Sequence, residues 1–112
     1  MMSLVNITKK LKEALTNLDC DVIHYYAEPA QTVPYVVWAE TEESEHFYIN
    51  NRKKEQVLGG YVEYYTQQEF DTNTDAIQSI LDAECDTWEL NLVEYLDNEK
   101  LIRFIWHWSI RG

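Results

Sequence analysis

Residues 59–81 read GGYVEYYTQQEFDTNTDAIQSIL, and the rest of the predicted fold is arranged around this stretch. Tyr61 to Thr66 alternate with a period of two, which is typical of a half-buried strand. Thr72 then fits a helix N-cap, with Asp75 three residues on as a capping-box partner. An apolar stripe at helical spacing follows, made of Ala76, Ile77, Ile80, Leu81 and Cys85. The pattern predicts an aromatic strand that leads directly into an amphipathic helix.

Periodic patterns cover the rest of the chain. A stripe from Leu4 to Leu18 predicts a first helix with Ser3 as its N-cap. Strands are expected at 22–26, at 35–42 after Pro34, at 46–49, at 88–92 and at 102–110. Turns are expected at 28–32, 50–55 and 97–100.

Three details of these strands are expected from local composition. The second strand becomes acidic around Glu42 to Glu45 and is expected to leave the core there. The adjacent Gly59 and Gly60 indicate a bulge or a close backbone approach. Trp88, Leu90 and Leu92 alternate with polar residues, so we expect them to share one buried face.

This order predicts one α+β domain over residues 1–112. We expect an antiparallel β-sheet of about five to six strands, with two helices packed on one face. The last strand has the cleanest alternation, with Phe104, Trp106 and Trp108 pointing one way. The expected core residues are Trp38, Tyr64, Ile77, Ile80, Leu81, Phe104, Trp106 and Trp108.

Composition excludes several classes of protein. Nearly half of the residues are apolar, which excludes a disordered chain. The apolar runs are only a few residues long, so no transmembrane helix is expected, and the N-terminus lacks the pattern of a signal peptide. Folding in the cytoplasm of the producing cell follows by default.

Cys20 and Cys85 have no metal-type spacing and are expected to be reduced, packed thiols, with a disulfide between them as the alternative.

The charge is strongly negative and unevenly placed. The formal net charge is −11, and twelve carboxylates but no Lys, Arg or His lie between Lys54 and Lys100. Positive charge is concentrated at 9–12 and at 52–54. Because binding to a phosphate backbone requires cationic contacts, we do not expect the chain to grip nucleic acid. An acidic surface that aids solubility is the simplest explanation of this charge.

Motifs that carry catalytic chemistry are missing from the sequence. His24, His46 and His107 stand alone, and the acidic run at 40–45 lacks the glycine and the fixed offsets of a calcium loop. The aromatic residues lack the basic neighbours that stacking on RNA requires. We therefore expect no enzyme activity, no cofactor, no metal and no small-molecule substrate.

Two stretches carry a resemblance to a known family. They are VPYVVW at residues 33–38 and GYVEYYTQQEFD at residues 60–71, in the context of a leading helix and a closing hairpin with Trp88, Tyr95 and Trp106. In order and spacing the chain resembles the phage minor capsid and tail-terminator proteins, which are small prophage-encoded parts of long-tailed phages. The likeness covers most of the chain.

The resemblance implies a non-enzymatic structural protein of the virion, made in the bacterial host cytoplasm. Such a protein caps the finished tail tube as a ring of copies, commonly a hexamer, and provides the surface that joins tail to head. Its expected partners are itself, the tail-tube protein and the head-completion or connector protein, with DNA only as a passing polymer. Neck and head-closure proteins look similar at this level, so a place in the neck or at the head closure of the virion also fits the sequence.

A ring requires one patch on a subunit to meet a different patch on the next. Arg52, Lys53 and Lys54 are expected at the tip of a hairpin, and Glu42 and Glu43 begin an acidic stretch. We therefore expect these five residues to contact a neighbouring subunit or the tube protein, since complementary charge sets register and partner choice. The alternative function is that of an acidic DNA mimic that inhibits a host nuclease or restriction enzyme.

Overall fold

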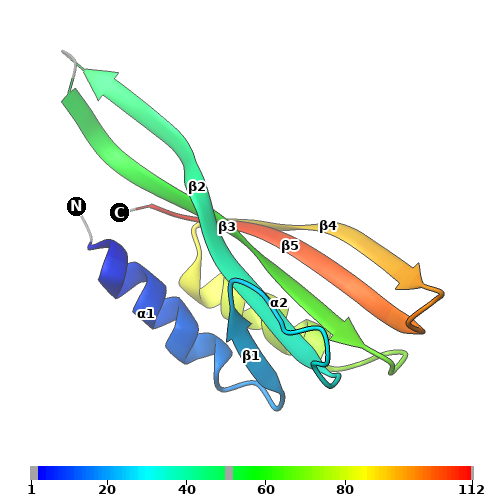
Figure 1. The fold of residues 1–112 in the computed structure, drawn as a ribbon. Coiled ribbons are helices and arrows are strands. Elements are labelled where there is room, and N and C mark those ends of the chain that lie inside the picture. The colour runs from blue at the N-terminus through cyan, green and yellow to red at the C-terminus, as the bar shows by residue number, and fades with distance from the viewer. Residues whose placement is uncertain (1–2, 50–51, 112) are drawn as a thin grey trace.

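The computed structural model describes the backbone of residues 3–49 and 52–111, and the side chains of residues 3–41 and 57–111. Two helices and five strands follow one another along this part of the chain (Figure 1). Their bounds are α1 Leu4–Leu15, β1 Asp21–His24, β2 Tyr35–Ile49, β3 Arg52–Thr66, α2 Asn73–Glu84, β4 Thr87–Leu96 and β5 Leu101–Arg111.

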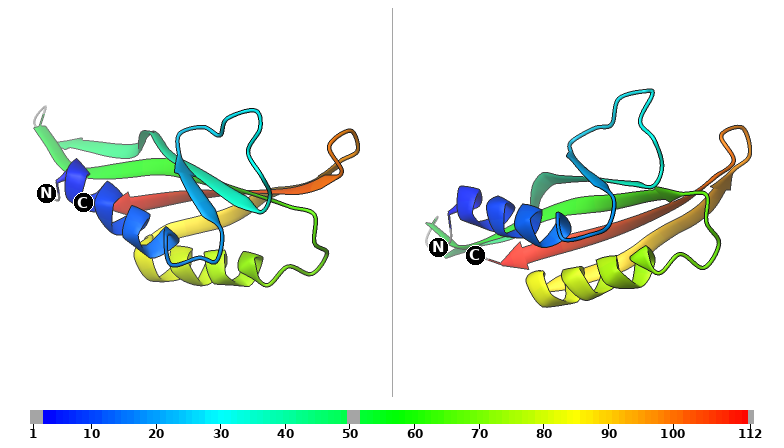
Figure 2. Two further views of the ribbon diagram at one scale, coloured as in Figure 1. Left: turned by 60° about the horizontal axis from the view of Figure 1, so that its bottom comes forward. Right: turned by 90° about the horizontal axis from the view of Figure 1, so that it is seen from below.

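The five strands form one sheet in the order β1-β2-β3-β5-β4. The pairs β2–β3, β3–β5 and β4–β5 are antiparallel, and both helices lie on one side of the sheet (Figure 2). The expected α+β class is confirmed. The sheet is mixed rather than wholly antiparallel, because Asp21 pairs in parallel with Tyr35 and His24 with Trp38. The ten residues 25–34 connect these two parallel strands, which a two-residue hairpin turn could not do.

β2 and β3 form one long hairpin, which corrects two expectations. β2 does not end at the acidic residues Glu42–Glu45, and 46–49 is its continuation rather than a separate strand. Register shifts between Glu40 and Glu42, and between Glu43 and Glu45, keep this irregular stretch in the ladder. A bulge absorbs an extra residue without ending a strand, and side-chain alternation does not reveal it.

The basic residues expected at a turn lie in a strand. Lys53 pairs with Tyr48, and Arg52, the first residue of β3, pairs with Ile49. β3 meets β5 only from Val57 onward, so the outer half of the hairpin extends past the other strands (Figure 1). Residues 50–51 of the expected tip lie outside the described residues.

Gly60 allows a close approach between β3 and its neighbouring strands. A Cβ atom at this position would lie 2.2 Å from the carbonyl oxygen of Ala39 and 2.4 Å from Cζ2 of Trp108. The expected close approach is therefore confirmed, while the bulge lies in the facing strand β2, between the partners of Gly59 and Gly60.

The core fills the space between the sheet and the two helices. Trp38, Val62 and Trp106 are register partners across β2, β3 and β5 and face the helices. The helices contribute Ile7, Leu11 and Leu15 from α1 and Ile77 and Leu81 from α2. Among the expected core residues, Trp38, Tyr64, Ile77, Leu81, Trp106 and Trp108 are buried, and Ile80 and Phe104 are partly buried at the margin.

β4 departs from its expected burial. Leu90 faces Trp106 and Leu92 faces Ile105, so Asn91 is an extra residue in this strand. This bulge turns Leu92 to the face away from the helices, and only Trp88 of the expected trio is partly buried. The expected buried face is therefore wrong, because a bulge reverses the alternation in an edge strand.

Trp106→Ala is expected to lower the free energy of unfolding by about 4 kcal/mol, because it empties a fully buried site and removes the Nε1 hydrogen bond to Gln78 (3.1 Å). Chemical denaturation followed by circular dichroism measures this loss. His107→Ala, at the next position on the exposed face, is the control. A Trp106→Ala protein as stable as the wild type would contradict the assignment of this face to the core.

Candidate interaction surfaces

A buried carboxylate joins the end of β3 to the start of α2. Asp71 Oδ2 accepts hydrogen bonds from the hydroxyls of Tyr64 (2.6 Å) and Thr66 (2.7 Å). Its Oδ1 accepts the backbone N–H of Asn73 (2.9 Å), whose side-chain amide donates to the Tyr64 hydroxyl (2.9 Å). The two strand residues, the loop and the helix start are therefore held by one side chain.

This arrangement corrects the predicted helix cap. Thr72 stands at the N-cap position of α2 but makes no side-chain capping hydrogen bond, and Asp71 supplies the acceptor instead. Asp is as good an acceptor as Thr for the first N–H groups of a helix, so the residue type at position 71 suits this role. Burial opposes ionisation of Asp71, yet the hydrogen bonds from Tyr64, Thr66 and Asn73 lower its pKa below the ordinary value.

The same loop presents an aromatic ring to solvent. Phe70 is 91% exposed and has φ of 56°, a left-handed conformation that bulky residues rarely adopt. The Thr66 hydroxyl also accepts the N–H of Gln68 (3.1 Å), which fixes the other end of the loop. The junction thus holds Phe70 in a conformation that leaves its ring uncovered in the described chain.

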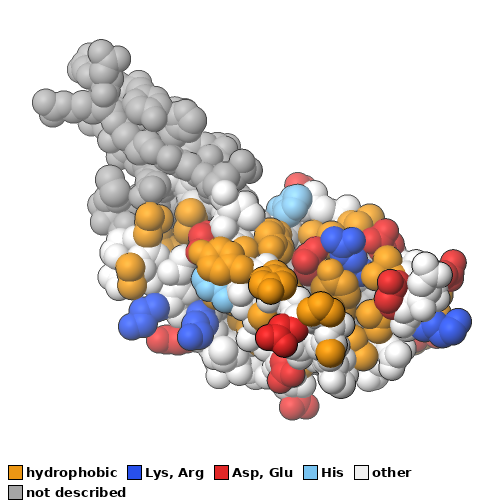
Figure 3. Space-filling view, in the orientation of Figure 1, with side chains coloured by type: hydrophobic (Ala, Val, Ile, Leu, Met, Phe, Trp, Pro, Cys, Tyr) orange, Lys and Arg blue, Asp and Glu red, His pale blue; other side chains and the backbone are white. Residues whose placement is uncertain are grey.

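The face of the sheet away from the helices carries a row of side chains across four strands. Tyr35, Tyr65, Arg103 and Glu94 are register partners, and the two tyrosine rings stack with centroids 4.8 Å apart. Arg103 lies 5.9 Å from the centre of the Tyr65 ring and donates to Glu94 (3.0 Å) and to Glu63 (2.8 Å). In Figure 3, hydrophobic side chains form a band across the middle of the molecule.

The Arg103 side chain is held by its contacts with the other residues of this row. The hydrogen bond to Glu63 raises the pKa of Arg103, and burial raises the pKa of Tyr65 to about 12, so the guanidinium is charged and the phenol is neutral at pH 7. Because two carboxylates already occupy the guanidinium, it is a poor anchor for a phosphate group. The row therefore suits contact with protein better than contact with nucleic acid.

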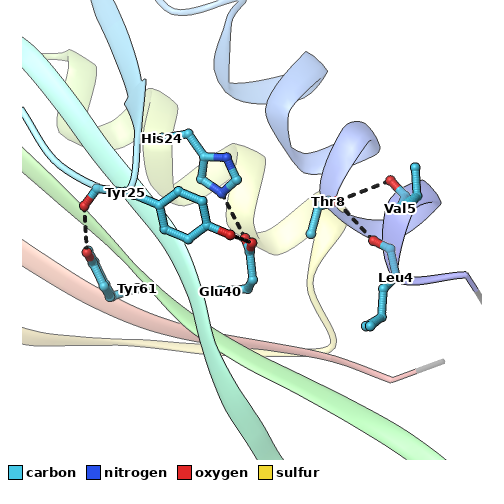
Figure 4. Close-up of polar contacts among 7 residues, drawn as sticks. All are labelled: Leu4, Val5, Thr8, His24, Tyr25, Glu40 and Tyr61. Atoms are coloured by element: carbon cyan, nitrogen blue, oxygen red, sulfur yellow. Dashed lines mark hydrogen bonds and ion pairs between the residues drawn. The ribbon is translucent and has the colours of Figure 1, made fainter.

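The short strand β1 is fastened by a cluster around His24 (Figure 4). Its ring stacks on Trp38 (4.0 Å) and on Tyr25 (3.9 Å), and its Nε2 lies 2.8 Å from Glu40 Oε2. The Tyr25 hydroxyl donates to the other oxygen of Glu40, and the Tyr61 hydroxyl donates to the Tyr25 carbonyl oxygen (3.1 Å). These contacts join β1 and the segment 25–34 to β2 and β3, which is a structural role for His24.

The two sides of the molecule differ in charge and in the apolar side chains that they expose. α2 lies between α1 and β4, since Lys10 pairs with Glu84 (3.8 Å) and Trp88 donates to Asp82 (3.2 Å). The β4 side exposes apolar side chains, Leu90, Leu92, Val93 and Tyr95, beside carboxylates. The α1 side exposes lysines, and Figure 3 shows Lys or Arg side chains at the lower left, where α1 lies.

The expected contact residues are only partly placed. The backbone of Glu42 and Glu43 lies in β2, and that of Arg52, Lys53 and Lys54 in β3, within the same projecting hairpin. Their side chains lie outside the described residues, so the expected contacts stay predictions. Asp71, Phe70 and the row around Arg103 were not among the site residues predicted from the sequence. Only Asp71 had a local signal, as a helix-capping residue at a strand end.

Metal and thiol chemistry has no centre in the described part of the chain. No group of three or more His, Cys, Asp or Glu residues there could hold a metal ion. Cys20 and Cys85 are free thiols, as expected, and burial raises their pKa values to about 11 and about 12. Thiols of this kind are weak nucleophiles at neutral pH.

A comparison of the sequence with protein-family models and with curated proteins finds no match. Neither of the two described helices has the length and apolar character needed to span a bilayer.

Asp71→Asn is expected to lower the free energy of unfolding by about 3 kcal/mol, since an amide cannot accept all three donors and loses the charge that strengthens them. Asp75→Asn, an exposed change in the first turn of the same helix, is the control and should have an effect below about 0.5 kcal/mol. Denaturant titrations at pH 7 measure both.

The contribution of Asp71 to the free energy of unfolding should depend on pH in one direction. Because the folded-state pKa of Asp71 is lowered, its contribution is complete above the ordinary carboxyl pKa of about 4 and is lost as pH falls through the folded value. The stability difference between wild type and Asp71→Asn should therefore shrink on acidification. A difference that stays constant from pH 7 to about pH 3 would contradict the assignment.

Proposed function

We propose that this chain is a structural protein of the head–tail junction of a long-tailed phage or prophage. Copies of it cap the finished tail tube as a ring, in the simplest case a hexamer, and present the surface to which the head joins. Its partners are then other copies of itself, the tail-tube protein and the head-completion or connector protein. The likeness of residues 33–38 and 60–71 to the tail-terminator proteins supports this assignment.

One structural observation carries the proposal. The described part of the chain leaves nine large hydrophobic side chains exposed. The net charge of −11 offsets the loss of solubility that these side chains cause in a free monomer. Apolar side chains that lie together on a surface are typical of contact sites, and on β4 three exposed ones, Leu90, Val93 and Tyr95, share one face. Phe70 and the tyrosines of the open sheet face add to this surface. Such a chain suits a component that is buried in an assembly on several sides.

The acidic composition also suits a position around passing DNA. Carboxylates repel the phosphate backbone, so a channel lined with them does not retain the polymer that moves through it. The described lysines do not form a groove of the kind that follows a nucleic-acid backbone.

The second candidate function is inhibition of a nuclease or restriction enzyme by DNA mimicry. The run of twelve carboxylates between Lys54 and Lys100 favours it. Against it, Glu89 and Glu94 on β4 are separated by exposed apolar side chains, Leu92 and Val93. A phosphate backbone presents its charges at regular, close spacing, which this arrangement of β4 does not reproduce.

Purified protein is expected not to bind duplex DNA at about 150 mM salt, because net charge opposes the contact. Fluorescence anisotropy with a labelled duplex measures binding, and a salt series down to about 20 mM checks that no weak cationic site is hidden. Measurable affinity at the higher salt concentration would contradict passage of DNA without adhesion.

The junction assignment is tested by deleting the gene from an inducible phage or prophage that carries it. We expect DNA-filled heads and separate, unjoined tails of irregular length in electron micrographs, and recovery of joined particles when the wild-type gene is supplied in trans. The gene for a Trp106→Phe protein, supplied in trans in the same way, is the matched control. Provided that it is folded, this variant should also restore joined particles, because the change is buried and keeps the described surface. Normal yields of complete virions from the deletion strain would refute the proposal, and inhibition of a host nuclease by the purified protein would favour the alternative.

A further inference from the structure

β4 has the features of an edge that another protein covers. It is the last strand of the sheet, and no described element pairs with its outer side. Its exposed side chains include Leu92, Val93 and Tyr95, and neither Lys nor Pro occurs in Thr87–Leu96 to block pairing. Proteins that keep such an edge free usually protect it with Lys, Pro, a bulge or charged side chains, or cover it with a helix or loop. β4 has a bulge at Asn91, yet it is ten residues long and keeps apolar side chains exposed along its second half.

The α1 side of the molecule offers a complementary surface. Val5, Lys9 and Lys12 follow one another at spacings of four and three residues, so they share one helix face, and all three are exposed. Lys10 is paired with Glu84, but Lys9 and Lys12 make no ion pair with a described residue. This face, the α1 stripe, combines an apolar side chain with two cations.

We propose that the α1 stripe of one copy of this chain covers the β4 edge of the next copy. Lys9 and Lys12 then lie against Glu89 and the other carboxylates of the β4 side, and Val5 packs on the exposed apolar side chains of β4. The two surfaces lie on opposite sides of α2, so one molecule cannot satisfy its own edge. The contact is therefore heterologous and builds a closed ring if the rotation between copies closes.

Charge decides between this contact and a symmetric one. Pairing of β4 with β4 of a second copy would bring Glu89 of both chains to a single seam, where like charges repel, and Glu94 of each chain is already paired with Arg103. Contact with the α1 stripe replaces this repulsion with attraction. The inference deepens the proposed function and rests on it for the closed ring, whereas the contact itself is testable on the purified protein alone.

The test uses two variants that each damage one surface. The edge variant carries Glu89→Lys and Val93→Lys, and the stripe variant carries Lys9→Glu and Lys12→Glu. Glu28→Lys, in the segment 25–34, is a control outside both surfaces. Circular dichroism and thermal unfolding establish that each protein is folded, and the single change Glu89→Lys replaces the edge variant if the double change unfolds the chain. Sedimentation velocity up to about 1 mM protein then measures association, since this range reaches weak contacts.

The expected result is that wild type and Glu28→Lys associate, while each damaged variant alone associates at least about tenfold more weakly. An equimolar mixture of the two variants should regain association, because an intact α1 stripe from one meets an intact β4 edge from the other. The inference is overturned if wild type stays monomeric, if the mixture associates no better than its components, or if only the edge variant loses association. If the purified protein fails this test but the deletion strain shows the joining defect, the contact between α1 and β4 is wrong and the junction assignment stands. If the protein associates as expected but the deletion strain shows no joining defect, the junction assignment is wrong and the contact stands.

Discussion

The Asp71 carboxylate is the interaction on which the arrangement of the two layers depends. It accepts hydrogen bonds from Tyr64 and Thr66 at the end of β3 and from the first residue of α2. A strand and a helix joined by a short loop can meet at many angles, and this side chain selects one of them. That angle places Ile77 and Leu81 over the aromatic side chains of β3 and β5. A buried acceptor with every donor in place is stabilising, and the same group with one donor removed is costly.

The layers leave the molecule with surfaces of different character. The helices cover one side of β2, β3 and β5, so the bulkiest aromatic residues are removed from water there. β4 lies at the margin of this cover, and its bulge at Asn91 turns apolar side chains to both faces. The opposite side of the molecule carries the lysines of α1. A single chain with unlike sides is suited to head-to-tail assembly, which is the basis for the proposed ring at the end of a phage tail.

The periodicity of apolar residues predicted the regular parts of the fold, where buried and exposed positions recur at a fixed spacing. The alternation of Phe104, Trp106 and Trp108 and the helical stripe containing Ile77 and Leu81 predicted the core because regular elements preserve their period. The failures lie where the backbone gains a residue or pairs at long range. The bulge at Asn91 reversed the face of Leu92, and the parallel pairing of β1 depends on a partner distant in sequence. Arg52 to Lys54 are as polar as a turn but lie in a strand. The candidate surfaces were less predictable, because the Arg103 row unites four strands.

We propose that copies of this chain meet through unlike surfaces at the head–tail junction. Cryo-electron microscopy of virions from a phage that carries the gene tests it most directly. We expect a ring of copies between the tail tube and the connector, with α1 of each subunit against β4 of its neighbour. A junction whose density is fully explained by other proteins would contradict this proposal, as would a ring in which β4 remains uncovered.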